Sequence, residues 1–438
     1  MNYILLSGGS GTRLWPLSNH IRSKQFIRVF RRENGIYESM LQRVYHQIKK
    51  ADPEANIIIA TAKAQVSSIL NQLEEKVEIS IEPCRKDTFP AIVLACEYLT
   101  GRLGIDKEEK VIVCPIDPYV NNSYFEVLQE LPGVLQKKQV NLALLGICPT
   151  YPSEKYGYIL PETDEKTSRI LEFKEKPSME MAQKYIAAGG LWNAGVFAFK
   201  VGYMAQRAHE LIDFRDYDDL FYKYSSLEKI SFDYAVVEKE QRMEVLRYSG
   251  DWKDLGTWNT LTEAMEENRI GNAVMDGNCK NVHIINELSI PVLAMGLKDV
   301  VVSASPDGIL VSDKAQSSYI KPYVEAMQQQ VMYAQKSWGE YRVLDVGEES
   351  LAIKITLHAG HQMNYHSHEY RDEVWNVISG TGRVVVDGLE KPCSAGDIIS
   401  LPEGCKHTVI AESDLQIIEV QTGPEINVGD KVKYSFEC

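Results

Sequence analysis

The spacing of apolar residues changes along this chain, and that change limits its possible folds more than any other feature. From Met1 to about Asn268, short apolar runs alternate with helix-like stretches. The runs are NYILLS, NIIIAT, KVIVCPI, NLALLGI and GVFAFK, and the helix-like stretches include TFPAIVLACEYL and SMEMAQKYIAA. Strands that alternate with helices are joined by crossovers, which favour a mostly parallel sheet. Residues 1–270 are therefore predicted to form an α/β domain.

The remaining residues have a different pattern. Residues 271–336 contain the short apolar runs NVHII, VLAMG, DVVVSAS and GILVSD, separated by Asn, Asp and Gly, and then the polar stretch YVEAMQQQVMYAQK. We expect a small β unit there, followed by a linker helix over the polar stretch. Residues 337–438 are nearly all short strands and turns, a pattern typical of a closed barrel or jelly roll. Three domains suit a chain of 438 residues, which exceeds one ordinary core.

Composition excludes several classes of protein. Hydrophobic residues make up 44% and charged residues 25%, as in soluble globular chains. No apolar stretch approaches the ~20 residues of a membrane span, and MNYILLSGG lacks the flanks of a signal peptide. We therefore expect a cytoplasmic chain with no membrane partner. A net charge of -14 argues against nucleic-acid binding. The eight cysteines show no CxxC spacing and are expected to be reduced and buried.

A glycine-rich loop, LLSGGSGTRLWPLS, follows the first apolar run. Glycines there let the backbone approach a phosphate chain, successive N–H groups bind anions, and Arg13 adds positive charge. The loop matches neither GxxxxGK[ST] nor GxGxxG, and a simple tight turn is the alternative interpretation. The loop residues that we expect to bind a polyphosphate are Ser7, Gly8, Gly9, Gly11, Thr12 and Arg13.

Further motifs accompany this loop. SGGSGTRLWPLS followed by SKQF resembles the signature of the sugar-1-phosphate nucleotidyltransferases that make GDP-mannose, which reads GGxGxRLWPLSR and PKQF. Matching pieces follow in order: EPCRKDTFPAI, PIDPYV, GICPTYPSEKYGYI, FKEKP, WNAGVFAF, FDYAVVEK and DWKDLGTW. Together they resemble the long mannose-1-phosphate guanylyltransferases, which often carry a phosphomannose isomerase domain at the C-terminus. The resemblance implies a Rossmann-like nucleotidyltransferase domain, GTP and a sugar 1-phosphate as substrates, Mg²⁺ as cofactor, and a homo-oligomer.

Guanylyl transfer requires positive charge around the reacting phosphates. Arg13 and Lys24 are placed to neutralise a triphosphate, and in the family the lysine of KQF sits at the reacting phosphate. Asp117 follows a buried strand, and Asp254 matches the family's second metal carboxylate, so together they are expected to hold one Mg²⁺. A surface lysine and turn-forming aspartates are the alternative interpretations.

The sugar side is predicted from two other motifs. In FKEKP, Glu175 offers an acceptor for sugar hydroxyls and Lys176 a cation for the sugar phosphate. In WNAGVFAF, Asn193 can both donate and accept hydrogen bonds, and Gly195 lets the backbone lie close to the ring. Gly157 of KYGYI is expected to do the same.

The base side rests on the resemblance, which points to Glu82 and Arg85 of EPCRKDTFPA. The sequence departs from the family pattern at several positions. Ser23 replaces the usual proline before KQF, IDP replaces SDH, and Asp87 and Phe89 replace Asn and Ala in the base-side motif. The last change leaves open a different nucleotide, or a different sugar such as a heptose 1-phosphate.

The C-terminal part contains a second set of motifs. GHQMNYHSHEYRDEVWNVISG has the spacing G-x5-HxH-x4-E-x6-G, and GDIISLPEGCKH ends in a further histidine. Both resemble the two motifs of the cupin barrel. Alternation on a strand places His366 and His368 on one face, and Glu373 and His407 can complete a site for Zn²⁺, Mn²⁺ or a similar divalent ion.

Isomerase activity of this barrel is a separate hypothesis. Val374 and Ala411 replace a histidine and an asparagine of the isomerase pattern, EDDIVR becomes VGDKVK, and no catalytic base is assigned. A barrel kept for assembly or sugar sensing is the alternative. A regulatory protein that binds sugar nucleotides without turnover is the alternative for the whole chain. The combined presence of Arg13, Lys24, Asp117, Lys176 and Asp254 favours the enzyme, since a binder does not need so many phosphate-neutralising groups.

Overall fold

The computed structural model describes residues 1–9, 12–19, 21–32, 34–73, 77–136, 140–327, 330–427 and 430–435. The chain packs into two compact units. The first comprises Met1–Ser10, Gln25–Val66 and Gln72–Glu266, and the second comprises Gly11–Lys24, Ser67–Asn71 and Glu267–Cys438. The predicted division into domains 1–270, 271–336 and 337–438 stays a prediction. None of the helices formed by the described residues has the length and apolar character needed to cross a membrane.

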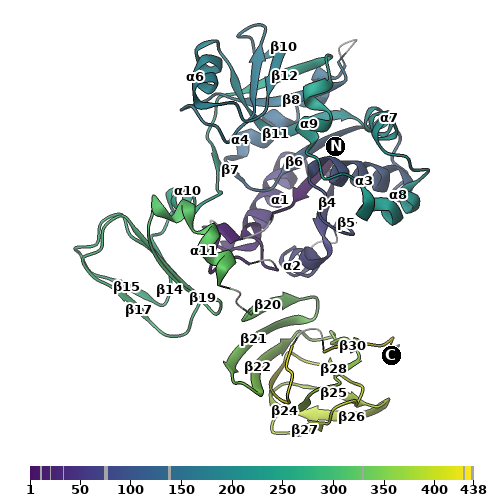
Figure 1. Cartoon of the computed structure of the whole chain (residues 1–438), viewed down its shortest axis with the longest axis vertical. Helices are drawn as coiled ribbons and strands as arrows, with labels where there is room; N and C mark the ends of the chain where they lie inside the picture. Colours follow the sequence, from purple (N-terminus) through teal and green to yellow (C-terminus); the bar gives the residue numbers. More distant parts are fainter. Residues whose placement is uncertain are drawn as a thin grey trace. The chain divides into compact units, whose positions relative to one another are not determined.

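A nine-stranded sheet forms the centre of the first unit, in the order β5-β4-β1-β6-β11-β8-β12-β10-β9 (Figure 1). Its strands are β1 Asn2–Ser7, β4 Asn56–Ala62, β5 Glu78–Glu82, β6 Lys110–Pro115, β8 Leu142–Ile147, β9 Tyr158–Pro161, β10 Thr167–Lys174, β11 Leu191–Lys200 and β12 Met243–Tyr248. Two small pairs accompany it: β2 Phe30–Arg31 with β3 Tyr37–Glu38, and β7 Pro118–Val120 with β13 Trp252–Asp254. All five predicted apolar runs are strands.

The sheet is parallel along β5-β4-β1-β6 and between β8 and β12, as the crossover pattern predicts. Elsewhere it is mixed, because β11 runs antiparallel to β6 and β8. β9 and β10 are also antiparallel. The short connection between β9 and β10 can join only antiparallel neighbours. The first unit is therefore an α/β fold whose parallel part carries the loop after β1.

Helices cover the sheet of the first unit (Figure 1). They are α1 Met40–Ala51, α3 Thr88–Gly101, α4 Asn122–Leu128, α5 Leu131–Val134, α6 Met179–Ala187, α7 Val201–Leu211, α8 Tyr217–Lys223 and α9 Phe232–Ala235. α10 Trp258–Ala264 also belongs to this unit, and the residues of α2 Val66–Gln72 are divided between the two units. α3 contacts β1, β4 and β5 as well as α7, α8 and α9. A helix enclosed on all sides is apolar all round, which explains its sequence TFPAIVLACEYL.

The β part of the second unit consists of short parallel strands. They are β14 Arg269–Gly271, β15 Ala273–Met275, β16 His283–Asn286, β17 Val292–Ala294 and β18 Val300–Ser305, followed by the antiparallel β19 Gly308–Asp313. Parallel pairing of β14 with β16, β16 with β18, and β15 with β17 gives a β-helix-like coil. Its small core contains Val282, Ile284, Ala294 and Val302.

The linker helix is shorter than predicted. α11 covers Lys321–Ala326, whereas Tyr333–Lys336 form β20, so the prediction of a helix as far as Lys336 is wrong. β20 pairs antiparallel with β21 Gly339–Val346, which satisfies its backbone groups and buries Ala334. Sheet pairing thus determines the conformation of this polar segment.

Two sheets form the C-terminal cupin fold, in the orders β20-β21-β22-β29-β24-β27 and β26-β25-β28-β23-β30 (Figure 1). The remaining strands are β22 Ser350–Leu357, β23 His366–Ser367, β24 Asp372–Ser379, β25 Thr381–Val386, β26 Leu389–Ser394, β27 Ile398–Leu401, β28 His407–Ala411, β29 Leu415–Thr422 and β30 Val432–Lys433. Their core surrounds the fully buried Trp375. The seven cysteines within the described residues are free thiols, as predicted, but only four of them are buried, whereas Cys84, Cys148 and Cys279 are partly exposed.

Candidate functional site

The carboxyl ends of the parallel strands bring the predicted nucleotide-side residues to one edge of the sheet. Leu6 of β1 pairs with Pro115 of β6, so Ser7 and the glycines after it lie at the same edge as Asp117. Glu82 ends β5 at this edge as well. Open α/β sheets bind their ligands at such an edge.

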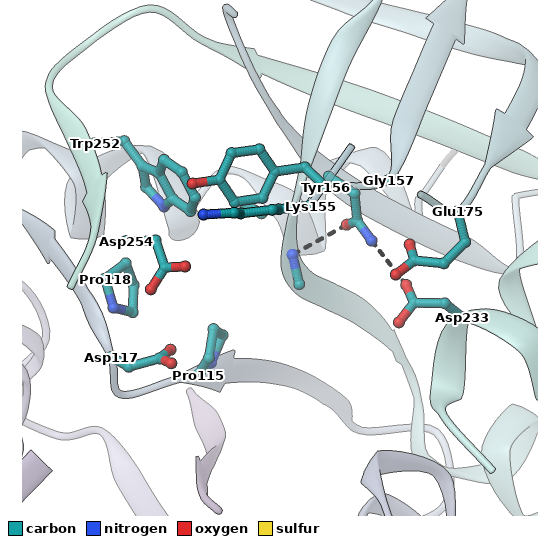
Figure 2. A pocket seen from close by; sticks show the side chains of 13 residues that line it. Pro115, Asp117, Pro118, Lys155, Tyr156, Gly157, Glu175, Asp233, Trp252 and Asp254 are labelled. Carbon is teal, nitrogen blue, oxygen red and sulfur yellow. Dashed lines mark hydrogen bonds between the residues drawn. The ribbon is translucent and has the colours of Figure 1, made fainter. Parts of the chain in front are cut away.

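Asp117 and Asp254 are brought together by a two-stranded ladder. β7 and β13 run antiparallel, and Asp254 lies directly opposite Pro118, the residue after Asp117. Both carboxylates line a pocket of about 210 Å³. Figure 2 shows them pointing into the pocket from one side, with the carboxylates of Glu175 and Asp233 on the other.

Asn193 organises the far side of the pocket. Its Nδ2 donates to Oδ1 of Asp233 at 2.7 Å, and its Oδ1 accepts from the Gly195 N–H at 3.0 Å. The backbone N–H of Asn193 donates to the Gly157 carbonyl at 2.8 Å. One side chain and its backbone therefore fix four wall positions relative to one another.

At two positions of the pocket wall, Gly157 and Gly195, a residue with a Cβ would not fit or would be strained. A Cβ on Gly157 would lie 2.5 Å from Oε2 of Glu175, so a larger residue would displace that carboxylate. Gly195 has φ +68°, a left-handed conformation that favours glycine. Glycine is thus required at 157 by the Glu175 carboxylate and favoured at 195 by the backbone conformation, whereas close approach to a sugar ring stays a prediction.

The sugar-side acids differ in their electrostatics. Oε1 of Glu175 lies 2.7 Å from Nζ of Lys176, whose side chain is 57% exposed. Burial, with the neighbouring Glu175 carboxylate as a second cause, raises the pKa of Asp233 to about 7. Near neutral pH, Asp233 can therefore carry a proton.

Aromatic side chains form part of the pocket wall, which the sequence did not predict. The ring of Tyr156 lies 4.9 Å from Trp192 and 5.5 Å from Trp252, measured between centroids. Tyr156 and Trp252 line the pocket, as do Lys155 and Asp233, which were not singled out either. All of these residues lie inside motifs used for the resemblance, but their side-chain directions depend on how β11, β13 and α9 pack.

Three of the predicted nucleotide-side residues, Ser7, Gly8 and Gly9, lie at the end of β1 and directly after it. Ser7 is fully buried, and its Oγ accepts from Nε2 of Gln25 at 3.2 Å. This contact connects the KQF motif to the end of β1. Gly9 has φ +128°, and a Cβ on Gly8 would meet no atom within 4 Å. The space beside the Gly8 backbone is therefore open.

The other predicted nucleotide-side residues lie in β5, in the loop after it, and in two short 3-10 helices. Oε2 of Glu82 accepts from the hydroxyl of Tyr224 at 2.8 Å, and Arg85 is exposed. Thr12 and Arg13 lie in the 3-10 helix η1, Thr12–Leu14, and Lys24 opens η2, Lys24–Phe26. Gly11 lies outside the described residues. Arg13 and Lys24 belong to the second unit, whereas the pocket belongs to the first.

The predicted cupin ligands form one buried cluster. The candidate ligand atoms of His366, His368, Glu373 and His407 all lie within 4.8 Å of one another. Nε2 of His368 is 3.0 Å from one oxygen of Glu373, and Nε2 of His407 is 3.3 Å from the other. Three imidazoles and one carboxylate in this arrangement fit a divalent transition metal or zinc.

The imidazoles are oriented by backbone carbonyls. Nδ1 of His366 lies 2.6 Å from the Asn364 carbonyl, Nδ1 of His407 lies 3.1 Å from that of Cys405, and Nδ1 of His368 contacts that of Asp430. Such contacts leave Nε2 for a metal. Burial lowers the pKa of His366, which favours the neutral form that ligates metals.

Arg371 borders this cluster and was not predicted. Its Nε donates to Oε1 of Glu373 at 3.2 Å, and its Nη2 lies 3.1 Å from Nε2 of His368. The indole N–H of Trp375 donates to the other Glu373 oxygen at 3.2 Å. These contacts fix the carboxylate within the barrel.

Two family descriptions match the chain: Nucleotidyl transferase over residues 2–269, and Mannose-6-phosphate isomerase C-terminal over residues 324–435. A Vibrio cholerae protein, provisionally named a mannose-1-phosphate guanylyltransferase, is 30% identical over 98% of both chains. The mannose-1-phosphate guanylyltransferase ManC of Salmonella typhimurium is 29% identical over 98% of this chain and 96% of its own. A solved Thermus thermophilus structure, described as mannose-1-phosphate geranyltransferase, is 26% identical, with TM-score 0.61 over 75% of this chain and 99% of its own. The chain therefore belongs to the mannose-1-phosphate guanylyltransferase family of nucleotidyl transferases, in the form that carries a C-terminal domain of the mannose-6-phosphate isomerase type.

Proposed function

We propose that this chain transfers the guanylyl group of GTP to mannose 1-phosphate, giving GDP-mannose and pyrophosphate. The observation that carries the proposal is the pocket that pairs Asp117 and Asp254 on one side with Glu175 and Asn193 on the other. A carboxylate pair suits a metal bound to phosphate, and a wall of acceptors and an amide suits a sugar. The names of full-length relatives support the same substrates.

On the phosphate side, Asp117 and Asp254 would hold Mg²⁺, which when bound neutralises charge on the reacting phosphates. The backbone N–H groups after Ser7 bind the triphosphate, and Arg13 and Lys24 neutralise it. Glu82 and Arg85 remain the candidates for contacting the base. These residues position the α-phosphorus for attack by the sugar phosphate oxygen, and no protein nucleophile is needed.

On the sugar side, Glu175 and Asp233 accept hydrogen bonds from hydroxyl groups, and Asn193 holds Asp233 in place. Lys176 pairs with the sugar phosphate. The aromatic rings of Tyr156 and Trp252 cover an apolar face of the pyranose and exclude water from the reacting groups.

Pyrophosphate release across a grid of nucleoside triphosphates and sugar 1-phosphates tests this proposal. GTP with α-mannose 1-phosphate should be the best pair and should require Mg²⁺. A preference of about tenfold or more for UTP or dTTP with glucose 1-phosphate, equal to about 1.4 kcal/mol, would contradict the guanylyl assignment. A preference for GTP with a heptose 1-phosphate would change only the sugar.

A second candidate function is favoured by the buried ligand cluster and the match to the isomerase C-terminal description. The cupin part would hold a divalent metal on His366, His368, Glu373 and His407 and interconvert mannose 6-phosphate and fructose 6-phosphate. Such a metal polarises a carbonyl when bound, and a separate base must move the proton between carbons. Glu419 is a candidate base, because it is buried opposite Trp375 on β29. Conversion of fructose 6-phosphate by the metal-loaded chain tests this function, and no conversion favours assembly or sugar sensing.

A further inference from the structure

The segment that follows the glycine-rich loop is bound by the β part of the second unit. We call residues 12–19 and 21–24 the signature segment; it contains Arg13. The guanidinium of Arg22 donates to both oxygens of Glu287, at 2.7 and 2.8 Å. The hydroxyl of Ser305 donates to the Pro16 carbonyl at 2.7 Å, and this contact is buried. The β part therefore fixes the conformation of the signature segment.

Asn19 has only one possible amide orientation. Its Oδ1 accepts from the backbone N–H groups of Ile21 at 2.8 Å and Arg22 at 2.7 Å. Its Nδ2 must then face the other way, where it donates to Oδ2 of Asp307 at 2.6 Å. Rotation of the amide would place a donor against two backbone donors, so Asn19 requires an acceptor at position 307.

The second carboxylate oxygen of Asp307 contacts the linker that leads to the cupin part. Oδ1 accepts from the backbone N–H of Met332 at 2.7 Å, immediately before β20, the first strand of the cupin sheets. The Asp307 N–H donates to Oγ of Ser305 at 3.1 Å, and the residue is 7% exposed. One buried carboxylate therefore contacts both the signature segment and the entry to the cupin part.

The ring of Tyr333, the residue after Met332, extends this connection. The guanidinium carbon of Arg22 lies 5.8 Å from the ring centroid. The hydroxyl of Tyr333 donates to Glu340 of β21 at 2.6 Å. The linker is therefore attached to the signature segment by a second contact that does not involve Asp307.

We propose that Asp307 is a positioning residue for nucleotide binding, which holds the signature segment, and with it Arg13, in the arrangement that meets the triphosphate. Because Asp307 also accepts from the N–H of Met332, a shift of the chain before β20 would change the position of the Asp307 carboxylate and hence of the signature segment. The inference rests on the proposed function, because it takes the ligand of the signature segment to be a nucleoside triphosphate.

A swap of the two side chains tests the contact. Asp307→Asn places an amide donor against the Nδ2 donor of Asn19. Asn19→Asp keeps the acceptor for Ile21 and Arg22 but places two carboxylates together. The double variant restores one donor and one acceptor, since the new amide can donate to the new carboxylate while its oxygen still accepts from Met332. Asp299→Asn is the matched control, because Oδ1 of Asp299 accepts from Nδ2 of Asn281 at 2.7 Å in the same β part, away from the signature segment.

Each single variant should raise the KM for GTP about tenfold, the effect of losing one charge-assisted hydrogen bond, with kcat within about threefold of the parent value. The double variant should recover most of that affinity, and Asp299→Asn should leave it unchanged. Thermal unfolding of all four variants checks their folding. A purely structural role would lower the unfolding temperature without this split between KM and kcat.

An unchanged GTP KM in folded single variants, or a double variant no better than the singles, would overturn the inference. If the parent chain prefers another nucleoside triphosphate, the KM for that nucleotide is the readout. If the parent releases no pyrophosphate, GTP binding by calorimetry replaces KM, and the same order of affinities is expected. An inactive parent contradicts the proposed function, whereas an active parent with unaffected variants contradicts only the role of Asp307.

Discussion

Nδ2 of Asn193 donates to Oδ1 of Asp233 at 2.7 Å, and this bond joins β11 to α9 at the wall of the pocket. Asn193 was predicted as a sugar contact, whereas Asp233 was not. The bond fixes which oxygen of Asp233 remains available to the pocket. Because Asp233 is buried in the first unit, the protonation of its carboxylate should also affect the free energy of unfolding of that unit.

The raised pKa of Asp233 predicts a pH-dependent stability. The folded chain binds this proton with a pKa of about 7, against the usual 3.8, so the stabilising effect of protonation is complete below pH 3.8 and is lost as pH rises through 7. Asp233→Asn cannot lose a proton and keeps the acceptor for Asn193. Relative to the parent, this variant should gain stability as the pH rises from about 4 through 7, by about 4 kcal/mol in total.

Thermal unfolding of both chains across this pH range measures the difference. The control is Asp251→Asn, which changes an exposed aspartate in the same unit. Parallel pH profiles for the parent and Asp233→Asn would show that the Asp233 carboxylate ionises normally.

Gly157→Ala should weaken binding of the sugar phosphate. The new methyl group would lie 2.5 Å from Oε2 of Glu175 and must displace that carboxylate. We expect the KM for mannose 1-phosphate to rise about tenfold, while the KM for GTP changes by less than about twofold. Gly133→Ala in α5 is the control, since a Cβ there meets no atom within 4 Å. Equal kinetics for the two variants would remove Gly157 from the sugar side.

Much of this arrangement was predictable because it depends on local pattern. The apolar runs predicted the central strands, and the position of Asp117 directly after a buried apolar run predicted that it would lie at the carboxyl end of a strand, as it does after β6. The HxH spacing predicted a shared face for His366 and His368, which the buried cluster confirms.

The features that were missed depend on long-range packing. Asp233 lines the pocket only because α9 packs beside β11, and the direction of its carboxylate follows from Asn193. The segment Tyr333–Lys336 has no apolar alternation of its own, and its pairing with β21 makes it a strand. The sequence also predicted a mostly parallel sheet, whereas the sheet is mixed, because β11 runs antiparallel to β6 and β8. The apolar pattern of a strand does not show the direction in which it pairs with its neighbours.

The cupin metal should be separable from guanylyl transfer. His366→Ala combined with His368→Ala removes two of four ligands, so about one dialysis-resistant divalent ion per chain should be lost. Guanylyl transfer should persist, since Asp117 and Asp254 lie in the other unit.

Metal analysis with a matched control decides this prediction. His358→Ala combined with His361→Ala removes two exposed histidines of the same cupin part and should leave the metal bound. A parent chain that holds no metal after dialysis would contradict the four-ligand assignment itself.

The central claim is that the pocket containing Asp117 and Asp254 is where GTP reacts. Its most direct test is the rate of pyrophosphate release by Asp254→Asn at the end of β13, compared with Asp251→Asn, which changes an exposed aspartate just before β13. Asp254→Asn removes charge from the metal side of the pocket, so turnover should fall on the order of a hundredfold or more in a protein that remains folded. Asp251→Asn should stay within about twofold of the parent, as expected of a surface substitution. Near-normal turnover by folded Asp254→Asn would contradict the assignment of this pocket as the site of transfer.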